Sequence, residues 1–94
     1  MFVLFVDAKL KPGAEEPLKK TFTETFRPAI SKQEGFRSVE LLQPNKAGEP
    51  WRVSIAFETH DLQKKWVALD LHQVVWPQME HHFADYSVNS YTSI

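Results

Sequence analysis

Two side chains in the second half of the chain, Trp66 and His72, have the types and spacing for chemistry on a small aromatic molecule. They stand six residues apart. An imidazole titrates near neutral pH, so His72 can take a proton from a phenol or an enol. The indole N–H of Trp66 needs a hydrogen-bond partner when it is buried. We therefore predict His72 as a catalytic base and Trp66 as a substrate-binding residue. The alternatives are a helix-capping His72 and a Trp66 that only packs in the core.

The other histidines do not form a metal-binding pattern. His81 and His82 are adjacent, so on a helix their side chains point about 100° apart. His60 has no histidine four residues away, and the chain has no cysteine. The sequence therefore predicts no metal site, no disulfide and no thiolate nucleophile.

Size and charge limit the possible partners. The chain has 94 residues, of which 43% are hydrophobic and 13% aromatic, which predicts one globular domain over residues 1–94. Eleven basic residues balance twelve acidic ones. Without a basic field, nucleic acid and anionic membranes are poor partners. The apolar run at residues 2–6 is too short for a signal peptide or a membrane span, so we expect a cytosolic location.

The first half of the chain predicts a strand, a helix and a second strand. Residues 2–10 alternate as a strand and are apolar on one whole face and half of the other. Leu18, Phe22 and Phe26 then recur at helical spacing. Pro28 should kink this helix or end its regular part near Arg27, and Gly35 should end the element.

The second half predicts two more strands and a helical region. Residues 36–43 and 51–58 alternate as strands around a polar loop at 44–50. Thr59 is the predicted N-cap of a second helix with Leu62, Trp66 and Leu69 on its apolar stripe and His72 near its end. Pro77 is predicted to begin a further helical turn, which presents three apolar residues on one side: Val75, Met79 and Phe83. Residues 85–94 form the last predicted strand.

The order βαββαβ predicts a ferredoxin-like α+β fold, a four-stranded antiparallel sheet with helices on one face. The other face would carry Val3, Phe5 and Val39 or its neighbours. An apolar sheet face left in water is an association site, so we expect a homodimer.

The order and spacing of several segments resemble the antibiotic biosynthesis monooxygenase family. The resemblance covers nearly the whole chain. It depends on the strand that ends in Lys11-Pro12-Gly13, the Glu34-Gly35-Phe36 entry to the second strand, the aromatic third strand, and the helical segment with Trp66 and His72.

The resemblance implies a dimeric α+β barrel, with a small-molecule pocket between sheet and helices in each subunit. We expect the pocket to include these substrate-binding residues: Trp66, Trp76, Phe22, Phe26 and Val6. In the cofactor-free, quinone-forming members, a hydrogen-bonding residue precedes the tryptophan by four positions, where this chain has Leu62. In the haem-degrading members, an axial histidine and an asparagine occupy the positions of Trp76 and Val6, so the resemblance implies no haem degradation.

Two functions follow as hypotheses. The first is a small cofactor-independent monooxygenase that acts on a phenol, quinol or enol. The alternative is a non-catalytic ligand-binding or dimeric module of the same fold. An RNA-binding domain shares the element order, but residues 52–57 lack the glycine and basic residues of its third-strand motif.

Overall fold

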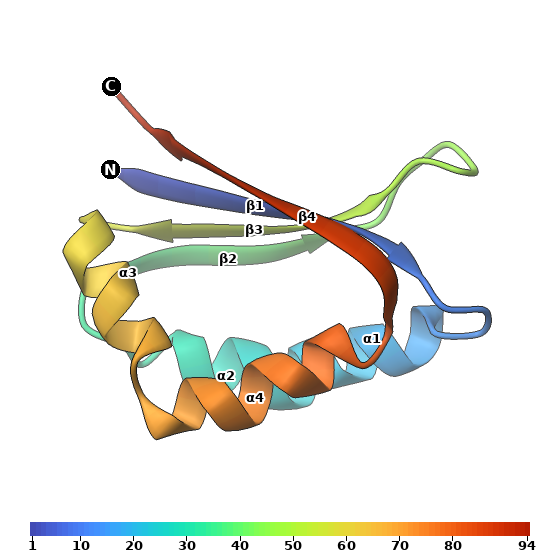
Figure 1. Cartoon of the computed structure of the whole chain (residues 1–94), viewed down its shortest axis with the longest axis horizontal. Coiled ribbons are helices and arrows are strands. Elements are labelled where there is room, and N and C mark those ends of the chain that lie inside the picture. The colour runs from blue at the N-terminus through green and yellow to red at the C-terminus, as the bar shows by residue number, and fades with distance from the viewer.

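A four-stranded antiparallel sheet carries the fold in the computed structural model, which describes residues 1–94. The sheet has the order β2-β3-β1-β4, and its strands are β1 (Phe2–Leu10), β2 (Phe36–Leu42), β3 (Trp51–Phe57) and β4 (Phe83–Thr92). β1 lies at the centre of the sheet, between β3 and β4 (Figure 1). The four predicted strands are confirmed. Phe83, which was predicted on the helical side, begins β4 instead.

The strand register separates a face covered by helices from an open face. On the covered face, Val6 pairs with Val53 and Val88. On the open face, Phe5 pairs with Ser54 and Asn89.

For β2, the sequence predicted Val39 or its neighbours on the open face, and it is the neighbours that lie there. Val39 pairs with Ile55 and packs against the core. A register shift between Phe36 and Ser38 moves the alternation of β2 by one residue, which reverses the faces. The neighbours of Val39 lie on the open face, where Glu40 pairs with Ser54.

One helical arm follows β1 and contains an unusual wide turn. It consists of α1 (Glu15–Thr21), a π-helical segment (Phe22–Phe26) and α2 (Arg27–Ile30). The N–H of Arg27 bonds to the carbonyl of Phe22, a five-residue step. Pro28 has no N–H to donate, so a wide turn directly before it is a way to continue the helix past the proline. The helical arm therefore continues past Pro28, but the turn before the proline is π-helical and not α-helical.

Gly35 ends this region at the entry to β2 for two reasons. Its φ angle is +78°, and a Cβ atom there would lie 2.4 Å from the Leu62 side chain. Only glycine meets both conditions without strain.

The second helical region consists of two helices, although the sequence predicted one continuous helix from Thr59 to His72. α3 (His60–Val67) begins at the predicted N-cap, Thr59, whose hydroxyl accepts a hydrogen bond from the Leu62 N–H at 3.2 Å. It ends at Val67, and α4 (Asp70–Glu80) starts after Leu69, which is extended with ψ 146° and 39% exposed. Leu69 is therefore not on an apolar helix stripe.

The break changes two further predictions. His72 lies in the first turn of α4, not near the end of the preceding helix, and Pro77 lies inside α4, not at its start. The two helices meet at the break (Figure 1), so His72 is free to turn back toward Trp66.

The helices cover one face of the sheet, and the core lies between the two layers (Figure 1). Fully buried side chains from both layers fill it: Phe26, Phe57, Leu18, Ile30, Met79, Val6 and Val53. This arrangement is the predicted ferredoxin-like α+β fold. None of the helices combines the length and the apolarity that crossing a membrane requires.

Candidate functional site

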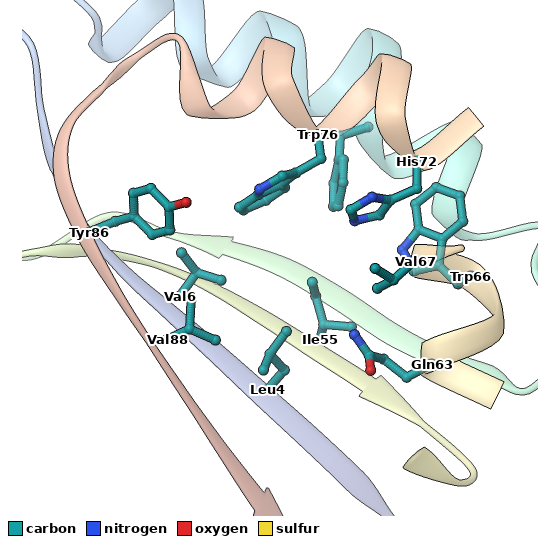
Figure 2. A pocket seen from close by; sticks show the side chains of 11 residues that line it. Leu4, Val6, Ile55, Gln63, Trp66, Val67, His72, Trp76, Tyr86 and Val88 are labelled. Atoms are coloured by element: carbon teal, nitrogen blue, oxygen red, sulfur yellow. The ribbon is translucent and has the colours of Figure 1, made fainter. Parts of the chain in front are cut away.

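A cavity of about 140 Å³ lies between the covered face of the sheet and the helices α3 and α4. Figure 2 shows its walls, which come from strands on one side and helices on the other. Nine of its eleven lining residues are hydrophobic. The eleven are Leu4, Val6, Phe26, Ile55, Gln63, Trp66, Val67, His72, Trp76, Tyr86 and Val88. An apolar cavity with a few converging polar groups is the usual form of a small-molecule site.

Aromatic rings form the helical wall of the cavity. The ring centroids of Trp66 and His72 lie 5.1 Å apart with an interplanar angle of 84°, so the two rings meet edge to face. Trp76 stacks nearly parallel to His72 at 6.4 Å, and Phe26 lies 5.5 Å from Trp76. Trp66 is only 2% exposed, and its neighbours fix its ring in one orientation.

His72 is held on one side by the amide of the next residue. The Nε2 atom of Gln73 lies 3.4 Å from Nδ1 of His72 and donates to the backbone carbonyl of Val67 at 3.1 Å. The backbone N–H of His72 donates to the carbonyl of Leu69 at 3.1 Å. These contacts join the first turn of α4 to the end of α3 and orient the imidazole toward the cavity (Figure 2).

Burial favours the neutral form of the imidazole. It lowers the pKa of His72 below the ordinary value of 6.5, and the carboxylate of Glu80 opposes this with a smaller effect. A neutral imidazole carries one proton, shared between two nitrogens, and its neighbours decide which nitrogen holds it.

Three further polar groups line the cavity: the side-chain amide of Gln63, the indole N–H of Trp66 and the hydroxyl of Tyr86. The indole N–H of Trp66 has no hydrogen-bond partner in the chain and is not sealed away from solvent. Figure 2 shows its nitrogen on the side of the ring that faces His72 and Val67. At the β4 end, the hydroxyl of Tyr86 donates to Oε2 of Glu80 at 2.7 Å, and this bond raises the pKa of Tyr86.

The structure brings five of the six predicted site residues to the cavity: Val6, Phe26, Trp66, His72 and Trp76. The sixth, Phe22, is buried but does not line it. Phe22 lies four residues before Phe26, about 6 Å away along a helix axis, and packs against the Arg27 guanidinium at 5.3 Å. Val6 and Trp76, the positions at which the resemblance implies an asparagine and an axial histidine for haem degradation, face the same cavity.

Sequence reasoning missed the polar residues Gln63, Gln73 and Tyr86. Gln63 stands three positions before Trp66 on α3, a spacing that puts both on one helix face and could have indicated it. Leu62, where the resemblance implies a hydrogen-bonding residue, packs against the core and Gly35. No three histidine, aspartate or glutamate side chains lie close enough together to hold a metal ion.

The fold and the cavity define a class: small ferredoxin-like domains with a ligand pocket between sheet and helices. The family model described as antibiotic biosynthesis monooxygenase matches residues 1–76. The chain belongs to this family.

Solved structures show the same fold at low sequence identity. A protein from Nitrosomonas europaea, described as a candidate antibiotic biosynthesis monooxygenase, is 16% identical, with a TM-score of 0.82 over 100% of this chain and 99% of that one. SnoaB, a cofactor-independent oxygenase from Streptomyces nogalater, is 17% identical, with a TM-score of 0.81 over 99% and 93%. A variant of MhuD with two manganese protoporphyrin IX molecules per active site is 18% identical, with a TM-score of 0.77 over 100% and 95%. Among curated proteins, no sequence matches this chain.

Proposed function

We propose that residues 1–94 act as one domain, a small cofactor-independent oxygenase for a single-ring phenol, quinol or related enol. The observation that carries the proposal is the edge-to-face contact of the His72 and Trp66 rings in the wall of an apolar cavity of ring size. Membership in a monooxygenase family and the fold shared with SnoaB, a cofactor-independent oxygenase, support the reaction class.

The volume of the cavity favours one ring. An engineered apolar cavity of about 150 Å³ accepts benzene, and the cavity here measures about 140 Å³. Drug-sized ligands occupy about 300–1,000 Å³. A phenol or hydroquinone fits this volume, while a polycyclic phenol requires the walls to move.

The proposed reaction balances with O₂ as the only co-reactant. A phenol with a free para position gives a quinone and water: C₆H₆O + O₂ → C₆H₄O₂ + H₂O. One oxygen atom enters the ring as the second carbonyl, and the other leaves as water. The four electrons that reduce O₂ come from the ring. Ionisation of the hydroxyl makes the ring electron-rich enough to begin this transfer, so the groups that control ionisation, first among them His72, are the proposed catalytic groups.

A homodimer is part of the proposal, because the open sheet face is neither fully polar nor covered. Phe5 lies at its centre, 5.6 Å from Tyr91 and under the guanidinium of Arg52 at 4.6 Å. Arg52 donates to both carboxylate oxygens of Asp7, at 2.7 and 3.2 Å. A face with an apolar centre and both signs of charge is suited to a second copy around a twofold axis.

Sedimentation at micromolar concentration tests the dimer. We expect a dimer for the native chain, a monomer for Phe5→Asp, and a dimer for Val74→Asp, which changes an exposed residue of α4. A native chain that sediments as a monomer contradicts the dimer. We also propose a cytosolic location, on the basis of the balanced charge and the lack of cysteine.

The second candidate is a binding module without catalysis. Leu62 favours it, because an aliphatic side chain occupies the position where the resemblance implies a hydrogen-bonding residue. In this case the aromatic wall would hold a ring and do no chemistry.

Oxygen uptake separates the two functions. The pure chain would be incubated with single-ring phenols, hydroquinones and polycyclic phenols, with and without a chelator. The oxygenase predicts O₂ consumption with single-ring substrates that the chelator does not change and that His72→Ala removes. His81→Ala, a histidine outside the cavity, should consume O₂ like the native chain. No uptake over the whole panel, together with saturable ligand binding, would favour the binding module.

A further inference from the structure

The amide group of Gln73 determines which nitrogen of His72 carries the proton. A backbone carbonyl can only accept a hydrogen bond, so the atom of Gln73 that lies 3.1 Å from the Val67 oxygen must be its NH₂ nitrogen. The same nitrogen lies 3.4 Å from Nδ1 of His72. With one N–H directed to Val67, the other is available to Nδ1. The Val67 carbonyl thus removes the ambiguity in the orientation of the amide.

A donor beside Nδ1 requires Nδ1 to be the acceptor. If Nδ1 carried the proton of the neutral imidazole, two N–H groups would point at each other. The neutral ring therefore has its proton on Nε2, the nitrogen on the side of the ring away from Gln73. In this tautomer His72 presents an N–H to a ligand and has no free lone pair there to accept a proton.

We propose that Gln73 is a positioning residue that holds His72 in the Nε2–H tautomer, and that His72 and Trp66 act as two N–H donors that bind the substrate as its oxyanion. This inference rests on the proposed function for the identity of the substrate. It replaces the general-base role expected from the sequence. The substrate hydroxyl releases its proton to solvent, and its oxygen then accepts from Nε2 of His72 and Nε1 of Trp66.

The rest of the cavity agrees with this assignment. No lysine or arginine lines it, so an oxyanion there would be stabilised by uncharged donors, which are the two ring N–H groups and the side-chain amide of Gln63. Donors fixed before the reaction cost no reorganisation when the charge develops. The other ionisable groups near the site are Glu80 and Tyr86, and the hydroxyl proton of Tyr86 is already donated to Glu80. Hydrogen bonds to a charged group favour it by about 10- to 100-fold in binding.

Nitrogen NMR of the full chain labelled with ¹⁵N-histidine tests the tautomer without substrate or turnover. The native chain should give the Nε2–H pattern for His72, while free histidine in the same buffer gives the averaged pattern and serves as the reference. Gln73→Glu should reverse the pattern, because a carboxylate accepts from Nδ1–H. Gln73→Leu should return His72 to the averaged pattern. Gln78 on the same helix also donates to a backbone carbonyl, that of Val74 at 3.1 Å, so Gln78→Glu and Gln78→Leu are matched controls that should leave His72 unchanged.

The absorbance of 4-nitrophenol tests the oxyanion site, because its ionised form is yellow. The native chain should bind the ionised form about 10- to 100-fold more tightly than the neutral form, which lowers the apparent pKa of the bound probe. Gln73→Glu should lose this preference, and Gln78→Glu should keep it.

Three results would overturn the inference: an Nδ1–H pattern for His72 in the native chain, a His72 pattern identical to that of free histidine, or a bound probe with no preference for its ionised form. Failure of the proposed function is a different result. If His72 has the Nε2–H tautomer and the chain prefers the ionised probe, but no phenol supports O₂ uptake, then the two donors form a phenolate-binding site and the oxygenase function is rejected.

Discussion

The two ends of the cavity differ in what they offer a ligand. At the end where α3 meets α4, His72 and Trp66 present ring nitrogens without any formal charge, and Gln73 fixes the imidazole from outside the cavity. At the β4 end, Tyr86 presents a hydroxyl whose proton is held by the carboxylate of Glu80. The first end favours a negative oxygen, and the second repels one.

This asymmetry has a consequence for how a ring would be oriented. An ionised oxygen belongs at the His72 end, away from Glu80. The Tyr86 oxygen has lone pairs left to accept a bond, so a group that donates, such as a second hydroxyl, belongs at the β4 end. Most of the wall between the two ends is apolar, so it selects a ligand by the shape of its ring and not by hydrogen bonds.

Removal of the imidazole should have the largest effect. His72→Ala should lower kcat/KM for O₂ uptake with a single-ring phenol by ~10²–10³-fold, the cost of one donor to a developing oxyanion. The melting temperature should change little, because His72 is only half-buried. Steady-state O₂ uptake and thermal melts of the same preparation check both values. A variant that unfolds more easily but keeps its turnover would make His72 a structural residue.

Loss of the indole donor should have the next largest effect. Trp66→Phe keeps most of the ring area and deletes the N–H, so affinity for ionised 4-nitrophenol should fall by about 10-fold or more. Affinity for a neutral ligand such as toluene should stay the same. Calorimetric titration with both ligands measures the difference. An equal loss for both would mean that Trp66 contributes shape alone.

Removing the negative charge at the β4 end should weaken the discrimination against anionic ligands, an effect smaller than the two above. Glu80→Gln removes the carboxylate that opposes anions, so an aromatic acid such as benzoate should bind several-fold more tightly than it does to the native chain. The pKa of His72 should fall further, because the Glu80 charge that raises it is gone. Competition against 4-nitrophenol reports the first effect, and NMR titration of His72 the second. Unchanged benzoate binding would remove the distinction between the two ends.

The pH dependence of stability should show the smallest effect. Burial lowers the pKa of His72 and of His82, so below about pH 6.5 the unfolded chain binds protons that the folded chain resists. The free energy of unfolding should therefore be highest above this pH and should decrease as the pH falls toward the lowered pKa values. Melting at a series of pH values should show a shallower decline for His72→Ala. Identical slopes in the two proteins would mean that burial does not perturb His72.

The strands, the order of elements and the aromatic wall were predictable, because alternation and helical spacing record which side chains face the core. Residues 2–10 and the helical spacing of Leu62 and Trp66 are examples. The break between α3 and α4 was not predictable from local signals. No glycine or proline lies between Trp66 and His72, and Leu69 continues the apolar spacing of a helix although the structure gives it an extended backbone.

The contacts of the site that could not be predicted from the sequence depend mainly on the break between α3 and α4. It reverses the chain so that His72 contacts Trp66, and it brings the Val67 carbonyl within reach of Gln73. Tyr86 also escaped prediction, because its place in the wall depends on how β4 pairs with β1.

A crystal structure of the chain with a bound single-ring phenol would show whether His72 and Trp66 hold the oxyanion. The ring should lie in the cavity between Trp76 and the sheet, with its oxygen within about 3.2 Å of both Nε2 of His72 and Nε1 of Trp66. A ring bound in the opposite orientation, with its only oxygen on Tyr86, or a ring bound outside this cavity would contradict it.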